Sequence, residues 1–301
     1  MQAVVHSAAQ GFSLATVPVP TLRPGQALVR VVASSVNPVD WKEWPHGSAG
    51  RDFAGTVVQA ISPCSRSVGD EVWGFAVSGA WAEYVAVSCD STGLKPTSAT
   101  MEQAGAMPLV ALTSLQAFTL AGAPWQSSPT VLVLGGSGGV GHIAIQVAKD
   151  LGAGKVITTT SAGNTDFVKS LGADEVIDYK TTDWATTLSP DSVDLVLDAV
   201  GETDCGDRAL PLIRAGGNFI TLIPGRAHLP TSSKAGVDQD MVMLSQTGAS
   251  RLDILKGFAD DGRLKVKIDS TFALSDIAAA VEHSQDGHVD GKISISMQPA
   301  S

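Results

Sequence analysis

The stretch Thr130-Val-Leu-Val-Leu-Gly-Gly-Ser-Gly-Gly-Val-Gly-His142 decides the fold of this 301-residue chain. Its first five residues, Thr130 to Leu134, form a continuous apolar run of the kind found in buried parallel strands. Gly135 to Gly141 supply a glycine-rich turn, and the apolar residues after Gly141 predict a helix that ends at Gly152. A strand, a glycine turn and a helix in this order predict a phosphate-binding turn.

The same alternation continues beyond this stretch. Apolar strands are expected at 155–160, 175–178, 194–200 and 218–223, and helices at 166–171 and 205–213. Apolar strands that alternate with amphipathic helices predict a parallel sheet covered on both faces.

The first hundred residues have a different character. Short strands are expected at 27–35, 56–61, 71–76 and 82–87, separated by Pro and Gly, which favours a barrel or a sandwich. An Ala-rich helical stretch, 101–121, is interrupted by Pro108. Near the end we expect helices at 251–260 and 274–284 and strands at 265–272 and 291–297. The last part should return to the first domain. The chain is therefore predicted to be an α/β protein with a first domain at 1–105, a second at 106–262 and a returning segment at 263–301.

The glycines of the turn have separate tasks. Gly135 permits the tight turn, Gly138 lets the backbone approach a pyrophosphate, and Gly141 lets the helix pack on the strand. The N–H groups around Gly139 and Val140 would then face the phosphates at the positive end of the helix. The alternative is a glycine-rich turn that binds nothing.

The residues after the second strand indicate which cofactor is bound. NAD enzymes usually carry a carboxylate there for the ribose 2′-hydroxyl. This chain has Ser161 and Asn164 instead, with Tyr179 after the next strand, and these groups can hydrogen-bond a 2′-phosphate. We therefore expect NADPH. The alternative for Ser161 and Asn164 is ordinary turn chemistry.

Composition excludes several function classes. The net charge is -10 and no basic stripe is present, which excludes a nucleic-acid partner. No apolar run is long enough for a membrane span. The three cysteines are an odd number without a CxxC, so we expect reduced thiols, no disulfide framework and no Cys-rich zinc site. The chain is predicted to be cytoplasmic, with a removed transit peptide left open.

Several segments together carry a resemblance to a known family. They are Val36 to Lys42 (VNPVDWK), Gly50 to Gly55 (GRDFAG), Val68 to Val72, Gly79 to Tyr84, the apolar 108–118 with Thr113, Leu171 to Asp174, Asp198 to Gly201 (DAVG) and His288 to Ile293. In this order the chain resembles the zinc-free medium-chain dehydrogenase/reductases of the quinone oxidoreductase type.

The resemblance implies a GroES-like, partly open β-barrel and an inserted Rossmann domain. It also implies NADPH, frequent homodimers, and quinones or α,β-unsaturated carbonyl compounds as substrates. Zinc-dependent relatives carry a Cys where this chain has Asn37, and Gly-His-Glu where it has Gly50-Arg51-Asp52. A catalytic zinc needs three protein ligands, so no metal is expected. The cofactor contacts implied by the resemblance are Asn37, Thr113, Val200, Gly201, Leu222, Ile223 and Lys292.

The candidate catalytic residues are Asn37, Asp40 and Lys42. Asn37 is a candidate donor to the substrate oxygen or to the nicotinamide ribose; its alternative is a turn residue before Pro38. Asp40 would hold Lys42, and Lys42 would donate to an oxyanion; its alternative is a solvated surface lysine. Trp41 and Trp44 are expected to line the substrate pocket. Trp81 is expected in the core, and Arg51 with Asp52 as a structural ion pair.

Two enzymatic activities remain open at this point, namely reduction of an activated C=C bond and reduction of a quinone. The alternative from another class is an NADPH-binding protein with a structural or regulatory role, like the lens crystallins of this family. A homodimer formed through an edge strand of the Rossmann sheet is also expected.

Overall fold

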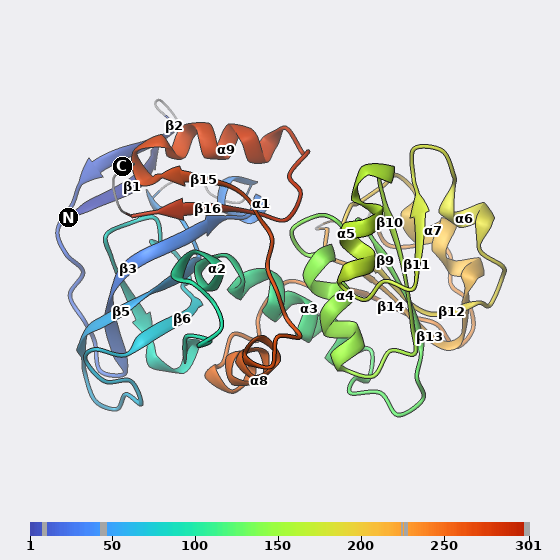
Figure 1. The fold of residues 1–301 in the computed structure, drawn as a ribbon, viewed down its shortest axis with the longest axis horizontal. Coiled ribbons are helices and arrows are strands. Elements are labelled where there is room, and N and C mark those ends of the chain that lie inside the picture. Colours follow the sequence, from blue (N-terminus) through green and yellow to red (C-terminus); the bar gives the residue numbers. More distant parts are fainter. Residues whose placement is uncertain (8–10, 43–46, 224, 226–227, 298–301) are drawn as a thin grey trace. The chain divides into compact units, whose positions relative to one another are not determined.

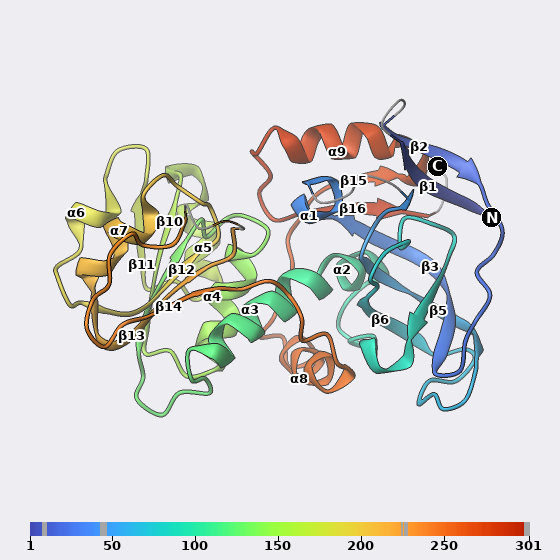
Figure 2. The ribbon, with the colours of Figure 1, turned by 180° about the vertical axis from the view of Figure 1, so that it is seen from behind.

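The computed structural model describes residues 1–7, 11–42, 47–223, 225 and 228–297. The chain divides into two compact units (Figures 1 and 2). The first unit combines Met1–Leu112 with Gln246–Ser301, and the second unit is Thr113–Ser245. The first and last parts of the sequence thus belong to one unit, as expected for a returning tail.

The second unit is built on a six-stranded sheet in which every neighbouring pair is parallel. Its strands are β9 (Thr130–Leu134), β10 (Lys155–Thr160), β11 (Glu175–Asp178), β12 (Val193–Asp198), β13 (Ile213–Thr221) and β14 (Asp238–Met241). Their order is β11-β10-β9-β12-β13-β14. Because the order reverses at β9, this is the doubly wound Rossmann arrangement that the apolar alternation predicts.

The helices of this unit are α4 (Gly141–Asp150), α5 (Thr165–Ser170), α6 (Trp184–Thr187) and α7 (Cys205–Ala209), with most of α3 (Pro108–Leu120). β9, β10 and β11 have the predicted bounds. The predicted helix 205–213 is shorter, because a 3₁₀ turn over Leu210–Leu212 follows α7 and β13 begins at Ile213. β14 was not predicted, because Asp238-Gln-Asp-Met241 has no apolar pattern.

The first unit contains two β-sheets. One has the order β2-β1-β4, from β1 (Gln2–Ser7), β2 (Gly11–Thr16) and β4 (Gly47–Ser48). The other joins β15, β16, β3, β5, β6 and β8 in that order, and β7 pairs with β3. The N-terminal strands of this sheet are β3 (Gln26–Val36), β5 (Asp52–Ala60), β6 (Glu71–Phe75), β7 (Tyr84–Ser88) and β8 (Thr92–Leu94). A short helix α1 (Pro38–Lys42) follows β3, and α2 (Met101–Ala106) is separated from α3 at Pro108 as predicted.

The returning tail completes the large sheet. β16 (Lys292–Ser296) pairs antiparallel with β3, with Ile293 opposite Val36, and β15 (Ile268–Ala273) lies outside it. Helix α9 (Ile277–Gln285) covers this part through Ile277, Ala280 and Val281, which pack with Trp81 in one apolar cluster. Helix α8 (Ala249–Asp260), expected in the second domain, packs against β8 in the first unit. None of the helices in the described residues is long and apolar enough to cross a membrane.

A disulfide bond joins Cys64 and Cys89, so the prediction of three reduced thiols is wrong. Cys64 follows β5, and Cys89 begins a 3₁₀ turn (Cys89–Ser91) after β7. β5 and β7 both pair with β3, and this brings the two cysteines to a Cα–Cα distance of 5.4 Å. An odd number of cysteines does not exclude one pair, and Cys205 remains the free, buried thiol.

Removing this disulfide should destabilise the protein. The two cysteines are 25 residues apart, and closing a loop of this length contributes about 3 kcal/mol to the free energy of unfolding. The double variant C64S/C89S should lose this amount in urea unfolding under oxidising conditions. C205S is the matched control, because it removes a free thiol. A loss below about 1 kcal/mol, with the bond shown intact in the parent by mass spectrometry, would contradict the expected stabilisation.

Candidate functional site

The carboxyl ends of the parallel strands bring most of the predicted cofactor residues to one edge of the sheet. The ends of β9, β10, β11, β12 and β13 carry, in turn, Gly135 to Gly141, Ser161 with Asn164, Tyr179, Val200 with Gly201, and Leu222 with Ile223. In doubly wound sheets the ligand crevice lies outside this edge, at the point where the strand order reverses. β9 and β12 are neighbours at that point.

Two glycines of the turn are required by packing alone. A Cβ on Gly141 would lie 2.0 Å from the Gly135 carbonyl oxygen, and one on Gly136 would lie 2.1 Å from Oγ1 of Thr158. Gly135 has a φ of +80°, a left-handed conformation that favours glycine. These residues therefore shape the turn whether or not a ligand binds.

Gly138 is different, because its nearest contact would be 3.3 Å, to the Gly135 carbonyl oxygen. Packing therefore does not demand a glycine at this position. The N–H groups of Gly139, Val140 and Gly141 have no acceptor within the described chain, and no side chain caps α4. Uncapped amides at a helix N-terminus form an anion site, and the missing side chain of Gly138 leaves room for the anion to approach. The turn therefore fits a dinucleotide pyrophosphate.

Asp198 is a site residue that the sequence analysis did not single out. It ends β12, is fully buried, and accepts hydrogen bonds at Oδ1 from the N–H groups of Val200 (3.0 Å) and Gly201 (2.8 Å). Its Oδ2 accepts from Thr221 Oγ1 on β13 (3.0 Å). One carboxylate thus fixes the loop after β12 against the end of β13. The sequence signal that could have indicated this role is an acidic residue at the end of an apolar strand.

The residues proposed for the 2′-phosphate lie after β10 and β11. Ser161 precedes a 3₁₀ turn (Ala162–Asn164), and Nδ2 of Asn164 lies 3.5 Å from the Ser161 hydroxyl. Tyr179 is half exposed, and its N–H donates to the carbonyl of Thr160, which brings the two strand ends together. No carboxylate occurs between Ser161 and Asn164.

The remaining predicted residues differ in how far they are buried. Thr113 is buried on α3. Trp41 is half-buried on α1, packs against the apolar cluster beneath α9, and donates from Nε1 to Ser284 Oγ (3.1 Å). Lys42 is exposed, with its ammonium 5.2 Å from the centre of the Trp41 ring. Trp44 lies outside the described residues. Trp81 is in the core as predicted, with no exposed surface.

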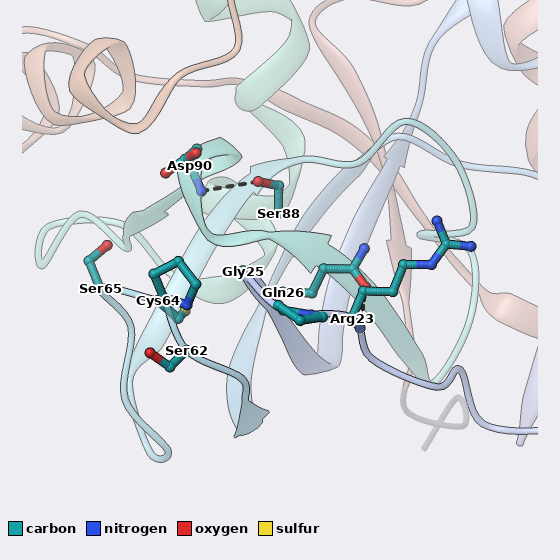
Figure 3. A pocket seen from close by; sticks show the side chains of 10 residues that line it. Arg23, Gly25, Gln26, Ser62, Cys64, Ser65, Ser88 and Asp90 are labelled. Atoms are coloured by element: carbon teal, nitrogen blue, oxygen red, sulfur yellow. Dashed lines mark hydrogen bonds between the residues drawn. The ribbon is translucent and has the colours of Figure 1, made fainter.

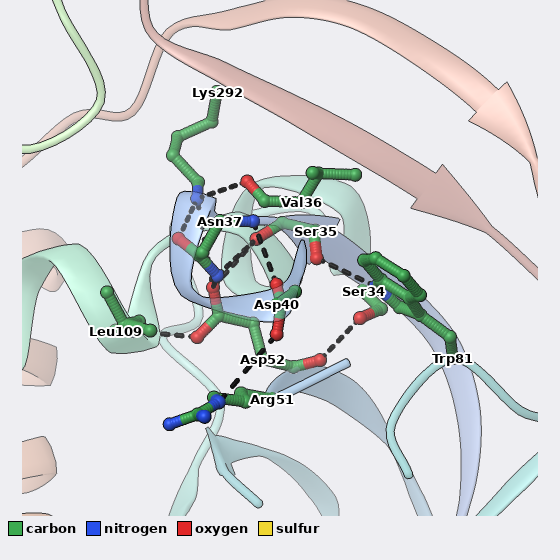
Figure 4. Close-up of polar contacts among 10 residues, drawn as sticks. All are labelled: Ser34, Ser35, Val36, Asn37, Asp40, Arg51, Asp52, Trp81, Leu109 and Lys292. Carbon is green, nitrogen blue, oxygen red and sulfur yellow. Dashed lines mark hydrogen bonds and ion pairs between the residues drawn. The ribbon is translucent and has the colours of Figure 1, made fainter. Parts of the chain in front are cut away.

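A buried cluster of charged and polar groups occupies the first unit where β3 ends (Figure 4). Asp52, at the start of β5, is fully buried and lies at its centre. Oδ2 of Asp52 accepts from Ser35 Oγ (2.7 Å) and Asn37 Nδ2 (2.8 Å), and Oδ1 accepts from the Leu109 N–H (2.7 Å). The Asp52 carboxylate thus has a hydrogen-bond donor for each of its two oxygens although it is buried. Sequence reasoning missed this role, because the donors come from distant segments.

Lys292 and Asn37 belong to the same cluster. The Lys292 ammonium donates to the carbonyl of Val36 (3.0 Å) and to Oδ1 of Asn37, and it lies 3.9 Å from Asp52 Oδ2. Lys292 and Asn37 are 3% and 1% exposed, so neither is a surface turn residue. With Oδ1 toward an ammonium and Nδ2 toward a carboxylate, only one orientation of the Asn37 amide is favourable.

The partners of Asp40 differ from the predicted Lys42, and they are Asn37 and Arg51. Oδ2 of Asp40 accepts from the Asn37 N–H (2.8 Å), while Oδ1 is buried, lacks a hydrogen-bond partner, and lies 3.9 Å from Arg51 Nε. Asp40 therefore fixes the first turn of α1. Burial, with the negative charge of Asp52 nearby, raises the pKa of Asp40 from 3.8 to about 7, although the Asn37 hydrogen bond opposes this.

The raised pKa of Asp40 predicts a pH-dependent stability. Between its unfolded value of 3.8 and its folded value of about 7, the folded protein binds more protons. Asp40 therefore contributes stability that is fully present below pH 3.8 and is lost as the pH rises through about 7. At about 1.4 kcal/mol per pKa unit, the loss is at most about 4 kcal/mol.

The variant D40N carries no ionisable group at this position. It should gain stability over the parent at pH 8.5 and show a smaller gain at pH 5, as measured by urea unfolding at both values. An equal difference at the two values would show that Asp40 does not titrate in this range.

A separate hollow of about 800 Å³ lies beside the disulfide, with Arg23, Ser62, Cys64 and Asp90 among its lining residues (Figure 3). It adjoins Gln26, where β3 begins, whereas the Asp52 cluster lies where β3 ends. β3 has 11 residues, which separates the two places by roughly 30 Å. The hollow has no buried polar group without a partner. We assign no ligand site there.

Two families of known proteins match segments of this chain. Residues 23–97 match the family described as alcohol dehydrogenase GroES-like domain, and residues 171–295 match the family described as zinc-binding dehydrogenase. The chain is 34% identical to a chloroplast envelope quinone oxidoreductase homolog of Arabidopsis thaliana, over 95% of this chain and 94% of that protein. The chain belongs to the quinone oxidoreductase and alkenal reductase family of the medium-chain dehydrogenases. The predicted family and the GroES-like and Rossmann fold are thereby confirmed.

Other members of this family carry related names. The chain is 33% identical to 2-methylene-furan-3-one reductase of Solanum lycopersicum, over 93% of this chain and 74% of that protein. The solved structure of the quinone oxidoreductase from Coxiella burnetii superposes with a TM-score of 0.85 at 30% identity, and the match covers 99% of each chain. Within the described residues, no group of three or more His, Cys, Asp and Glu could hold a metal ion. A zinc-free site stays a prediction for this member of the family.

Proposed function

We propose that this protein is an NADPH-dependent reductase of quinones or of the C=C bond of α,β-unsaturated carbonyl compounds. The observation that carries the proposal is the turn after β9. There Gly138 is not required by packing, and the N–H groups of Gly139, Val140 and Gly141 lack acceptors. Family membership supports the substrate class, because the relatives include a quinone oxidoreductase homolog and an NADPH-dependent alkenal/one oxidoreductase.

The second unit would hold the cofactor along the carboxyl edge of its sheet. When bound, NADPH supplies the hydride. The glycine turn would bind the pyrophosphate, and Ser161, Asn164 and Tyr179 would bind the 2′-phosphate. The nicotinamide half would contact Thr113, the loop of Val200 and Gly201 that Asp198 holds, and the backbone of Leu222 and Ile223.

The first unit would supply the remaining contacts. We propose that Asn37 and Lys292 contact the ligands, and that Asp40 and Asp52 hold them in place. Lys42 is a proposed donor from the surface of α1, and Trp41 and Trp44 are proposed walls of the substrate pocket. The single orientation of the Asn37 amide supports a defined role, because its two ends are bound by groups of opposite charge.

The variant S161D tests the cofactor assignment. A carboxylate after β10 would repel a 2′-phosphate and accept a hydrogen bond from a ribose hydroxyl. We expect the ratio of kcat/KM for NADPH to that for NADH to fall by at least about 10-fold, equivalent to 1.4 kcal/mol. S170D, on the exposed end of α5, is the matched control and should leave the ratio unchanged. An unchanged ratio in S161D would remove Ser161 from the 2′-phosphate site.

Assembly and location are also proposals. β14 is an end strand of the six-stranded sheet, and its Met241 is 42% exposed, which supports a homodimer formed through this edge. The cytoplasmic location was predicted from reduced thiols, and the Cys64–Cys89 bond removes that ground. Several relatives are named as chloroplastic, which supports an organelle as the alternative.

A further inference from the structure

The proposed reduction needs a proton as well as a hydride. A hydride adds two electrons and one hydrogen to the substrate, so the product forms only when a proton follows. A tyrosine phenol is a common proton donor, but neither of the two tyrosines, Tyr84 and Tyr179, belongs to the buried cluster of the first unit. The described side chains that bind one another in that cluster include no histidine or cysteine. Its only ammonium is that of Lys292.

The Lys292 ammonium has one hydrogen without a partner. Two hydrogens are used by the carbonyl of Val36 and by Asn37 Oδ1. Asp52 Oδ2, its ion-pair partner, lies 3.9 Å away, which is beyond hydrogen-bond distance, and already accepts from Ser35 and Asn37. Buried donors are nearly always satisfied, and Lys292 is only 3% exposed. An unsatisfied N–H on a buried ammonium therefore points to a ligand.

The surroundings of Lys292 favour release of this proton. Burial lowers the pKa of Lys292, although the carboxylates of Asp52 and Asp40 oppose this. Besides β3, the elements packed against β16 are β15, α2 and α9. Their charged side chains face elsewhere, because Glu102 of α2 and Glu282 of α9 are exposed and Asp269 of β15 pairs with His283 of α9. The charged groups that face the ammonium are therefore Asp52 and Asp40, with Arg51 beyond Asp40.

We propose that Lys292 delivers the proton that completes the reduction, while Asn37 and Asp52 hold its ammonium in place. This rests on the proposed function. After the substrate has accepted the hydride at one carbon, the electron pair of its double bond moves to the carbonyl oxygen. One N–H bond of Lys292 then breaks, the proton passes to this enolate, and the neutral amine regains a proton from water. Asp40, whose Oδ1 has no hydrogen-bond partner, lies in the same cluster.

Three variants distinguish the loss of proton transfer from the loss of positive charge and from the loss of folding. K292R keeps the positive charge but cannot give up a proton, because arginine stays charged in proteins. K292Q can still donate to Val36 and Asn37, but it is a neutral amide. K155M, at an exposed ion pair where β10 begins, is the matched control for loss of a lysine. Thermal melting of each variant checks folding.

Each variant is assayed for enone reduction and for its Kd for NADPH by fluorescence titration. We expect K292R and K292Q to lower kcat for the enone by at least about 100-fold, the size of a general-acid contribution. Their Kd for NADPH should rise by a much smaller factor than the factor by which kcat falls, and K155M should equal the parent in both quantities. The parent's kcat should fall as the pH rises through the pKa of Lys292, and this fall should be absent in K292R.

The outcomes separate this proposal from the proposed function. If the parent reduces no enone or quinone with NADPH, the proposed function fails first. If the parent is active and folded K292R keeps its kcat, Lys292 supplies only charge and the proton donor is another group. If K292R and K292Q raise the Kd for NADPH at least about 10-fold with kcat unchanged at saturation, Lys292 is a cofactor ligand. Either of the last two results overturns the proposal.

Discussion

Replacement of Gly138 by glutamate is expected to raise the Kd for NADPH by at least about 100-fold, or 2.7 kcal/mol, without unfolding the protein. A side chain at this position requires only a small shift of the backbone, because a Cβ there would meet only the Gly135 carbonyl oxygen, at 3.3 Å. A carboxylate beside the N–H groups of Gly139, Val140 and Gly141 would occupy the place of the pyrophosphate. It would also repel the phosphates at the positive end of α4.

Two controls separate this effect from general damage. G138A adds a methyl group without charge and should change the Kd far less. G257E adds the same charge on the exposed face of α8, where a Cβ would meet nothing within 4 Å. Fluorescence titration with NADPH measures all three variants. Tight NADPH binding by G138E would show that the pyrophosphate does not lie on this turn.

Replacement of Asp52 by alanine is expected to lower the free energy of unfolding by about 3–5 kcal/mol, the usual cost of leaving a buried charge without its partner. The variant would leave donors from Ser35, Asn37 and Leu109 without an acceptor. It would also remove one of the two carboxyl groups that act on the ammonium of Lys292, a residue that is only 3% exposed.

The matched control for this loss is E175A, which removes a partly exposed carboxylate paired with Lys155. An exposed pair contributes about 0–1 kcal/mol. Urea unfolding at pH 7 compares the two variants with the parent. A loss in D52A no larger than that in E175A would contradict the buried cluster around Asp52.

Much of the second unit could be predicted because its signals are local. The strand, turn and helix around Gly135 to Gly141 follow one another in sequence, and each has its own pattern. The apolar run 130–134 and the run 155–160 became strands with the predicted bounds. β14 could not be predicted, because its pairing with β13 is determined by its place at the edge of the sheet and not by an apolar pattern.

The Asp52 cluster shows what local patterns leave out. Its members come from β3, α1, β5, α3 and β16, and Lys292 lies 255 residues from Asn37 in sequence. Asn37, Asp40 and Lys292 were selected as separate candidates, but the approach of Lys292 to Asn37 and Asp52 depends on the pairing of β16 with β3. The Cys64–Cys89 bond was missed for the same reason, because β5 and β7 meet only through β3.

The proposed reductase activity is tested most directly by NADPH consumption with a simple enone and a para-quinone, each repeated with NADH, and with the products identified. We expect turnover of at least one of the two compounds, with a higher kcat/KM for NADPH than for NADH, and a saturated ketone or a hydroquinone as product. Tight NADPH binding without turnover of either compound would contradict the proposed activity and favour a structural or regulatory role for the bound cofactor.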